Sequence, residues 1–272
     1  AFVSVVYDLT VLKYPAYKEQ QPIFELRLKN ILKFSHKIIS ISEATRKDIL
    51  NFSAIDPERV ETIHLAADER FHELHQDKRH RIKDTLRKYG VDREYWLYVG
   101  NLGPHKNLET LVRVFDKAKK IHKIPHKLVL CGQRTWSRDL METIRRLGSK
   151  QEIIIADYVP DEDLPDIYLG ADLFVFISLH EGFGLPPLEA MSCGIPVIAS
   201  NVSSLPEVVG DAAVLVNPLK EDEILQSIMK VLGDSDLRKK LKEKGSRQSK
   251  KFSWDDTAKK TLDVFYRARS ML

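Results

Sequence analysis

The segment DLFVFISLHEGFGLPPLEAMSCGIPVIAS (residues 172–200) decides the fold of this chain. An apolar run, DLFVFIS, leads into a turn that contains Gly182 and Gly184, and Pro186 and Pro187 suit the first turn of the helix that follows. A second apolar run, IPVIAS, comes next. Strand, helix and strand in this order predict one unit of a parallel α/β sheet, whose ligands bind at the carboxyl ends of the strands.

The same alternation continues on both sides of this segment. The runs WLYVG, KLVLCG, EIIIADYV and AVLVNP predict further strands. Because these runs are continuously apolar, they favour a parallel sheet that is covered on both faces. Helices are expected between the strands at residues 107–122, 137–147, 162–169, 187–192 and 221–232. The predicted fold class is therefore α/β, with a doubly wound, Rossmann-like parallel sheet.

Residues 1–70 look like a different piece, with shorter elements. Strands are expected at residues 2–7, 37–41 and 60–65, and helices at 19–34 and 42–52. Three strands make a poor independent sheet. At the other end of the chain, Ser253 is a plausible N-cap for a final helix that carries the apolar residues Leu262, Val264 and Phe265.

The composition excludes several classes of protein. With 272 residues, 43% of them apolar, the chain can bury a sizeable core. Its 43 basic and 39 acidic side chains give a net charge of +4, an excess too small to indicate nucleic-acid binding. The sequence contains no run of 18 apolar residues and no recognisable signal peptide, so a cytoplasmic protein is the simplest interpretation. Cys131 and Cys193 lack C-x-x-C spacing and are expected to be buried free thiols.

Three charged side chains lie where the predicted strands end. Glu181 is on the turn and Glu189 is about two turns into the helix, and ionised carboxylates accept hydrogen bonds from sugar hydroxyls. Amide N–H groups at the start of that helix favour a diphosphate. In YVGNLGPHKNLETLV (residues 98–112), Lys106 opens another helix, where its ammonium can neutralise a departing diphosphate. Taken alone, each of these residues is better explained as a solvated surface charge, and only their combination favours the binding role.

With Glu181 and Glu189 in an E-x7-E arrangement, followed by GIPVIAS and LPEVVGDAAVLVNP, the chain resembles the retaining glycosyltransferases of family 4. The likeness extends over residues 2–254. It implies the two-domain GT-B fold, a nucleotide diphosphate sugar as donor substrate, and no metal or other cofactor. It also implies four regions: the end of an amino-terminal, acceptor-side domain (1–70), a connection with the first helix (71–94), a nucleotide-sugar-binding domain (95–253) and a helix that returns to the first domain (254–272).

The resemblance assigns roles to individual residues. Glu181 and Lys106 are expected to be catalytic, Glu181 at the hydroxyls of the transferred sugar and Lys106 at the leaving diphosphate. Glu189 would bind the nucleotide ribose. In DYVPDEDL, Val159 and Asp161 would contact the base, although Asp161 also suits a helix start. The remaining donor-binding candidates are Gly100, Asn101, Arg134 and the backbone amides of Phe183, Gly184 and Leu185.

Two positions depart from the pattern of the family. Asn101 stands where an arginine is frequent, which leaves neutralisation of the diphosphate more to Lys106. Tyr7, in VVYDLTVLKYP, takes the place of a histidine that many relatives carry. A phenol, which ordinarily ionises only near pH 10, can orient a sugar hydroxyl but cannot act as an imidazolium. Either the substrate geometry differs, or the activity is reduced or unusual.

The expected activity is transfer of a hexose, with mannose from GDP-mannose preferred, to a hydroxyl of a glycan or lipid-linked acceptor. UDP-glucose and UDP-N-acetylhexosamines remain alternative donors. A non-catalytic nucleotide-sugar-binding protein and another GT-B enzyme, an epimerase or a phosphorylase, remain alternative functions. The basic stretch at residues 116–127 is a candidate contact with anionic lipid at the inner face of the membrane, or else a solvated helix face. The histidines of FHELHQDKRH (71–80) lack the H-E-x-x-H spacing, which favours a solvated linker over a zinc site.

Overall fold

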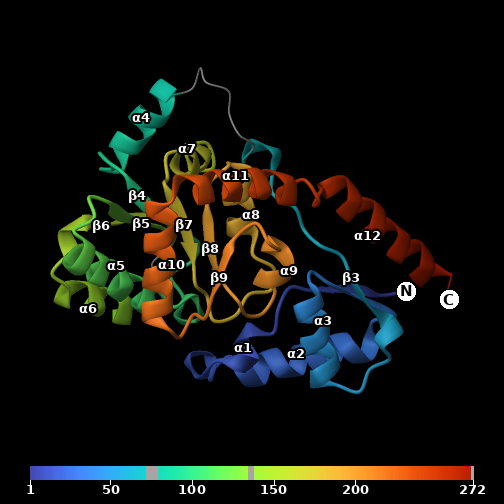
Figure 1. Cartoon of the computed structure of the whole chain (residues 1–272). Coiled ribbons are helices and arrows are strands. Elements are labelled where there is room, and N and C mark those ends of the chain that lie inside the picture. Colours follow the sequence, from blue (N-terminus) through green and yellow to red (C-terminus); the bar gives the residue numbers. More distant parts are fainter. Residues whose placement is uncertain (72–78, 134–137, 271–272) are drawn as a thin grey trace.

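The computed structural model describes residues 1–71, 79–133 and 138–270 of the chain. In these residues the strands form two parallel sheets (Figure 1). The smaller sheet has the order β1-β2-β3, with β1 at Val3–Val6, β2 at Lys37–Ser40 and β3 at Val60–Thr62. The larger has the order β6-β5-β4-β7-β8-β9, with β4 at Tyr95–Val99, β5 at Lys127–Cys131, β6 at Ile153–Asp157, β7 at Leu173–Phe176, β8 at Val197–Ser200 and β9 at Val214–Val216.

The α-helices lie between successive strands and after the last one. In the amino-terminal part they are α1 (Thr10–Lys13), α2 (Gln21–Phe34) and α3 (Glu43–Phe52). The larger sheet is accompanied by α4 (Arg79–Lys88), α5 (Leu108–His122), α6 (Arg138–Arg146), α7 (Leu164–Leu169), α8 (Leu185–Ser192), α9 (Leu205–Val209), α10 (Glu221–Gly233) and α11 (Ser235–Ser249). The chain ends with α12 (Trp254–Arg269).

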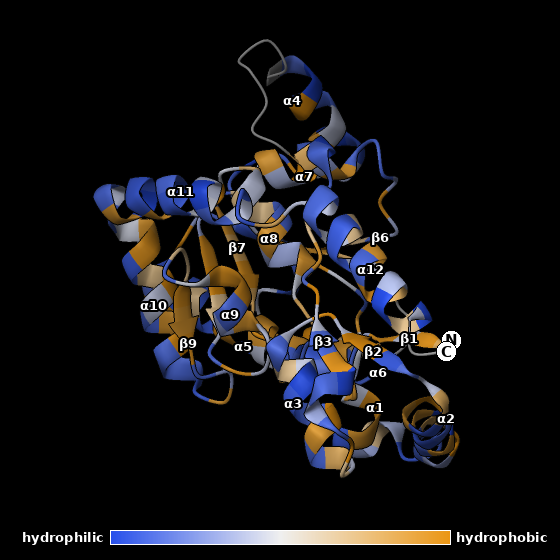
Figure 2. Cartoon of the chain, turned by 90° about the vertical axis from the view of Figure 1, so that its right-hand side faces the viewer, coloured by the Kyte–Doolittle hydropathy of each residue, from blue (hydrophilic) through white to orange (hydrophobic). Residues whose placement is uncertain are grey.

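The strand order of the larger sheet creates a crevice. Because β4 pairs with β5 on one side and with β7 on the other, the chain winds in opposite directions from β4, and the connections after β4 and β7 diverge. Helix α5 packs on α6 and α10, whereas α8 packs on α7 and α11, so the helices form two groups. The strands between them are hydrophobic, as Figure 2 shows for β7 and β9. The doubly wound arrangement expected from the sequence is therefore present.

The final helix packs on the smaller sheet. Ser253 caps α12 by accepting a hydrogen bond from the backbone N–H of Asp256 at 3.1 Å. Val264 is fully buried in a cluster with Ile39 and Ile63. The other apolar residues noted in the sequence, Leu262 and Phe265, are 50% and 48% exposed, because only one stripe of α12 faces the sheet.

Three helices were missed by the sequence patterns, namely α1, α9 and α11. The first two have only four and five residues, too few to show a period. Helix α11 has 15 residues, but its buried positions are mostly small or polar, Gly245 among them. A Cβ on Gly245 would lie 3.3 Å from the Met191 side chain, so close backbone packing on α8 replaces the apolar stripe that a sequence search looks for.

Candidate functional site

Lys106 and Glu181, which are far apart in the sequence, meet in the crevice between β4 and β7. Lys106 ends a short 3-10 helix, η5 (Pro104–Lys106), and Glu181 lies on the loop between β7 and α8. The ammonium Nζ is 2.7 and 2.9 Å from the two carboxylate oxygens, and each side chain is 11% exposed. The ammonium also lies 5.5 Å from the centre of the Phe176 ring. The structure therefore joins the two candidate catalytic residues in one largely buried ion pair.

Two serines fix the backbone at Glu181. The N–H of Glu181 donates to Ser203 Oγ at 3.1 Å. Its carbonyl oxygen accepts from the hydroxyls of Ser203 and Ser204, at 2.5 and 3.0 Å. Since this loop has no regular secondary structure, these side chains supply the partners that its backbone would otherwise lack. Neither serine was singled out from the sequence, where they appear only as polar residues before α9.

The start of α8 offers backbone donors. Gly184 has φ 113°, a left-handed conformation that glycine adopts readily, and no side chain caps the helix. Pro186 and Pro187 have no N–H, so the donors of this turn belong to Phe183, Gly184 and Leu185. Within the described residues, none of these three amides has an assigned hydrogen-bond acceptor. They remain able to bind an anion at the helix start.

Glu189 lies inside α8 and is held by a tyrosine. Its Oε2 accepts a hydrogen bond from the Tyr168 hydroxyl at 2.7 Å. Burial raises the pKa of Glu189 to about 7, although the hydrogen bond from Tyr168 and the positive charge of Arg70 act in the opposite direction. This carboxyl group therefore titrates near neutral pH. Tyr168, on α7, carried no recognisable signal in the sequence.

A cavity of about 290 Å³ opens at the carboxyl ends of β4, β5 and β6. Four predicted donor-binding residues line it, namely Gly100, Asn101, Val159 and Asp161. Val159 is buried, whereas the Asp161 carboxylate is exposed and forms an ion pair with Arg70 at 2.8 Å. Arg70 thus contacts one wall of the cavity and also lowers the pKa of Glu189. Arg134 lies outside the described residues.

Tyr7 approaches the site with its backbone rather than with its phenol. A Cβ on Gly182 would lie 2.2 Å from the Tyr7 carbonyl oxygen, so the loop before α8 packs directly on the turn after β1. Tyr7 as a whole is 62% exposed and lines a separate cavity of about 360 Å³ beside α2. No hydrogen bond is assigned between the phenol and either Lys106 or Glu181.

Aromatic residues that sequence reasoning missed surround the ion pair. The Tyr17 hydroxyl and His105 Nδ1 are 2.6 Å apart. Burial and the adjacent Lys106 charge lower the pKa of His105 to about 4, so its imidazole is neutral at pH 7. Burial and the negative charge of Glu181 raise the pKa of Tyr14. The only sequence signal was the position of His105 next to Lys106.

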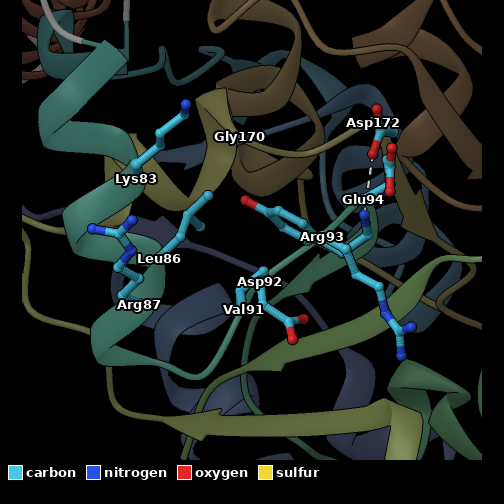
Figure 3. Close-up of a pocket in the computed structure, with 10 residues that line it drawn as sticks. Lys83, Leu86, Arg87, Val91, Asp92, Arg93, Glu94, Gly170 and Asp172 are labelled. Atoms are coloured by element: carbon cyan, nitrogen blue, oxygen red, sulfur yellow. Dashed lines mark hydrogen bonds between the residues drawn. The ribbon is translucent and has the colours of Figure 1, made fainter.

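A larger pocket lies at the opposite edge of the sheet. It has a volume of about 690 Å³ and is lined at the amino ends of β4 and β7 by residues that include Lys83, Arg87, Arg93 and Asp172 (Figure 3). Arg87 and Arg93 pair with acidic side chains, Asp84 and Glu152. Because ligands of doubly wound sheets bind at the carboxyl ends, we assign the site to the other end of the sheet, where the Lys106–Glu181 pair and the 290 Å³ cavity lie.

The basic stretch at residues 116–127 is largely paired within the protein. Lys117 contacts Glu221 at 2.8 Å, Lys120 contacts Asp116 at 2.6 Å, and Lys127 contacts Asp92 at 2.7 Å. These pairs reduce the positive charge available to a lipid surface, and the membrane contact stays a prediction.

No helix of the described chain is long and apolar enough to span a membrane. The described residues also contain no group of three or more potential metal ligands; the histidines at positions 72 and 75 lie outside them.

Comparisons with known proteins show which sequences and folds this chain is similar to. The family model described as "Glycosyl transferases group 1" matches residues 81–248. The chain is 33% identical, over 97% of its length, to O-antigen chain mannosyltransferase B of Escherichia coli, of which it covers 69%. It is 32% identical to the serotype-specific mannosyltransferase WbdA of Escherichia coli, again over 97% of its length, but covers only 33% of that protein.

Solved structures share the fold. Anabaena HepE in complex with UDP and glucose superimposes with a TM-score of 0.81 at 17% identity, over 97% of this chain and 71% of that one. WaaG, a glycosyltransferase involved in lipopolysaccharide biosynthesis, gives a TM-score of 0.76 at 18% identity, over 96% and 74% of the two chains. The predicted GT-B-like architecture is therefore confirmed.

Proposed function

The chain belongs to the group 1 glycosyltransferases, and from this premise we propose that it transfers mannose from a nucleotide diphosphate sugar to a hydroxyl of a growing glycan. We propose GDP-mannose as the donor and a polysaccharide of the O-antigen type as the product. We also propose that the transferred sugar retains its anomeric configuration. The similarity to the two Escherichia coli mannosyltransferases supports the choice of sugar and product. The observation that carries the proposal is the Lys106–Glu181 ion pair beside the free amides of α8.

The ion pair suggests how the donor is received. Without a donor, Lys106 and Glu181 neutralise each other in a site that is largely closed to water. A bound diphosphate brings negative charge to the ammonium and to the α8 amides, which stabilise it further as the glycosidic bond breaks. Glu181 then becomes free to accept hydrogen bonds from the hydroxyls of the sugar.

The other groups of the site fit supporting roles. Glu189 would accept from the ribose hydroxyls, and the 290 Å³ cavity would take the base against Val159. The chemistry we propose uses no protein nucleophile, since an oxygen of the leaving diphosphate can help to deprotonate the acceptor hydroxyl. A neutral His105 adds no positive charge that would compete with Lys106 for the diphosphate.

The test combines donor selectivity with variants of the ion pair. We expect a calorimetric titration with GDP-, UDP-, ADP- and dTDP-sugars to rank GDP-mannose first, and NMR of the product to show the retained anomer. Lys106→Met should lower kcat by about 10²- to 10³-fold, as loss of an electrostatic contact to the transition state does. Glu181→Gln should raise the KM for the sugar donor and also lower kcat. Lys244→Met, which removes an ion pair with Asp211 outside the site, is the matched control and should leave both constants unchanged.

A donor with another base that binds tenfold more tightly, a difference of about 1.4 kcal/mol, would contradict the choice of GDP-mannose. The exposed Tyr7 phenol favours one rival, a protein that binds nucleotide sugars without turnover. Tight donor binding without transfer to any glycan acceptor, by the full-length protein, would support that rival.

A further inference from the structure

His180, the residue before Glu181, lies buried between the two parts of the chain. Its Nδ1 is 2.9 Å from the hydroxyl oxygen of Thr10 at the start of α1. Its Nε2 is 3.1 Å from the Asp48 carboxylate on α3. Asp48 is also paired with Lys13 at 2.5 Å, so the imidazole belongs to a chain of four side chains. We name the contacts among Thr10, His180, Asp48 and Lys13 the seam network.

The seam network joins three elements of the structure through the imidazole ring of His180. The imidazole comes from the loop after β7, whereas its partners come from α1 and α3 in the amino-terminal part. The backbone N–H of Thr10 also donates to Asp8 at 2.7 Å, which ties the network to the turn that packs on Gly182. Both ring nitrogens of His180 have a hydrogen-bond partner, and the residue is buried. Breaking these hydrogen bonds would leave buried polar atoms without partners, which is costly in free energy. Movement of the loop relative to the amino-terminal part must therefore break the network.

We propose that His180 is a positioning residue, which holds the Glu181 loop in register with the amino-terminal part of the chain. This inference rests on the proposed function, because it gives a role to the geometry of Glu181. Ser203 and Ser204 fix the Glu181 backbone within the larger domain only, and Lys106 holds the carboxylate from the same side. His180 joins the loop to the other part from the side before Glu181, and the Thr45 hydroxyl, which donates to the Gly182 carbonyl oxygen at 3.3 Å, does so from the side after it. Reacting groups displaced by about 1 Å can lose about 10²-fold in rate.

Four variants separate positioning from stability. His180→Leu removes both contacts, His180→Gln keeps an amide near the Nε2 position, and His180→Asn keeps one near Nδ1. Thr10→Val removes one partner at nearly constant volume. We expect His180→Leu to lower kcat by about 10- to 100-fold, with the KM for the donor changed less than about threefold. The Gln and Asn variants should recover part of kcat, and Thr10→Val should have no further effect in the His180→Leu background.

His126→Gln is the matched control. His126 is half-buried near the amino end of β5, away from the network, and its substitution should leave kcat unchanged. Thermal melts of every variant give the folded fraction used to normalise kcat. If the normalised kcat of His180→Leu equals that of the wild type, or if Thr10→Val lowers kcat equally in both backgrounds, the proposal is wrong.

Hydrogen exchange separates this proposal from the proposed function. If His180 positions the loop, amides at residues 179–185 should exchange faster in His180→Leu and Thr10→Val than in wild type, whatever reaction the protein catalyses. Wild-type protein without transferase activity, but with this increase in the variants, would overturn the function and keep the positioning role. Unchanged exchange in that segment would overturn the positioning role alone.

Discussion

Glu189 is the residue whose charge we expect to control donor affinity. Its pKa of about 7 means that a large fraction is protonated at pH 6, and a protonated carboxyl group is a poorer acceptor for ribose hydroxyls. Donor affinity should therefore fall by up to about tenfold per pH unit below pH 7, as measured by calorimetry between pH 5.5 and 8.5. Because the Tyr168 hydrogen bond lowers this pKa, Tyr168→Phe should move the midpoint to higher pH.

Tyr95→Phe removes another buried tyrosine hydroxyl, which donates to the carbonyl of Ile167, and serves as the control. The pH at the midpoint of its donor-affinity curve should match that of wild type. Glu189→Gln should abolish the pH dependence of donor affinity. The same raised pKa affects folding. Between the ordinary value of 4.5 and about 7 the folded protein binds more protons than the unfolded chain, so Glu189 makes the free energy of unfolding fall as pH rises through this range. A donor affinity that stays constant from pH 5.5 to 8.5 would exclude this role.

The loop between β7 and α8 depends on a glycine that touches the other part of the chain. A Cβ at Gly182 would lie 2.2 Å from the Tyr7 carbonyl oxygen and 2.9 Å from the Asp8 Cβ, so Gly182→Ala must displace one of the two segments. We expect the free energy of unfolding to fall by about 1–3 kcal/mol, as overpacking does, and kcat to fall because Glu181 moves with the loop.

Gly233→Ala is the control for this substitution, since nothing lies within 4 Å of a Cβ at that position. Urea melts and steady-state kinetics of the two variants provide the comparison. A Gly182→Ala variant with the stability and kcat of wild type would show that the two segments separate at little cost.

The two parts of the molecule are also joined by a helix cap. The Glu207 carboxylate on α9 accepts from the backbone N–H groups of Glu43 and Ala44, at 3.0 and 3.2 Å, and so satisfies two donors at the start of α3. Burial alone would raise the pKa of Glu207, but the His64 imidazole at 3.6 Å and the hydrogen bonds from these amides outweigh it and lower the pKa below 4.5.

Glu207→Ala should therefore lower the free energy of unfolding at pH 7 by about 1–3 kcal/mol. Since a lowered pKa stabilises the folded state only while the group is ionised, the difference from wild type should shrink as pH falls from 4.5 through the folded pKa. Urea unfolding at pH 7 and below pH 4 tests both statements. Glu243→Ala, at an exposed position of α11, is the control. A difference that is the same at both pH values would contradict the proposed ionic cap.

The sequence by itself determined the larger sheet and the positions of its loops. Its strands are continuous apolar runs, and turns and helix starts have local signatures, so the loop around Glu181 and the helix opening near Lys106 were predictable. Helices such as α11 were not, because their buried faces are small or polar rather than apolar.

Only the tertiary structure decided which side chains act together. Lys106 meets Glu181, Tyr168 meets Glu189, and His180 meets Thr10 and Asp48 across large separations in the chain. It also left Tyr7, which the resemblance had given a sugar-orienting role, 62% exposed and lining a separate cavity. The physical reason is that periodicity and capping depend on neighbours along the chain, whereas hydrogen bonds, ion pairs and pKa values depend on groups that meet only when the strands align and the two parts pack together.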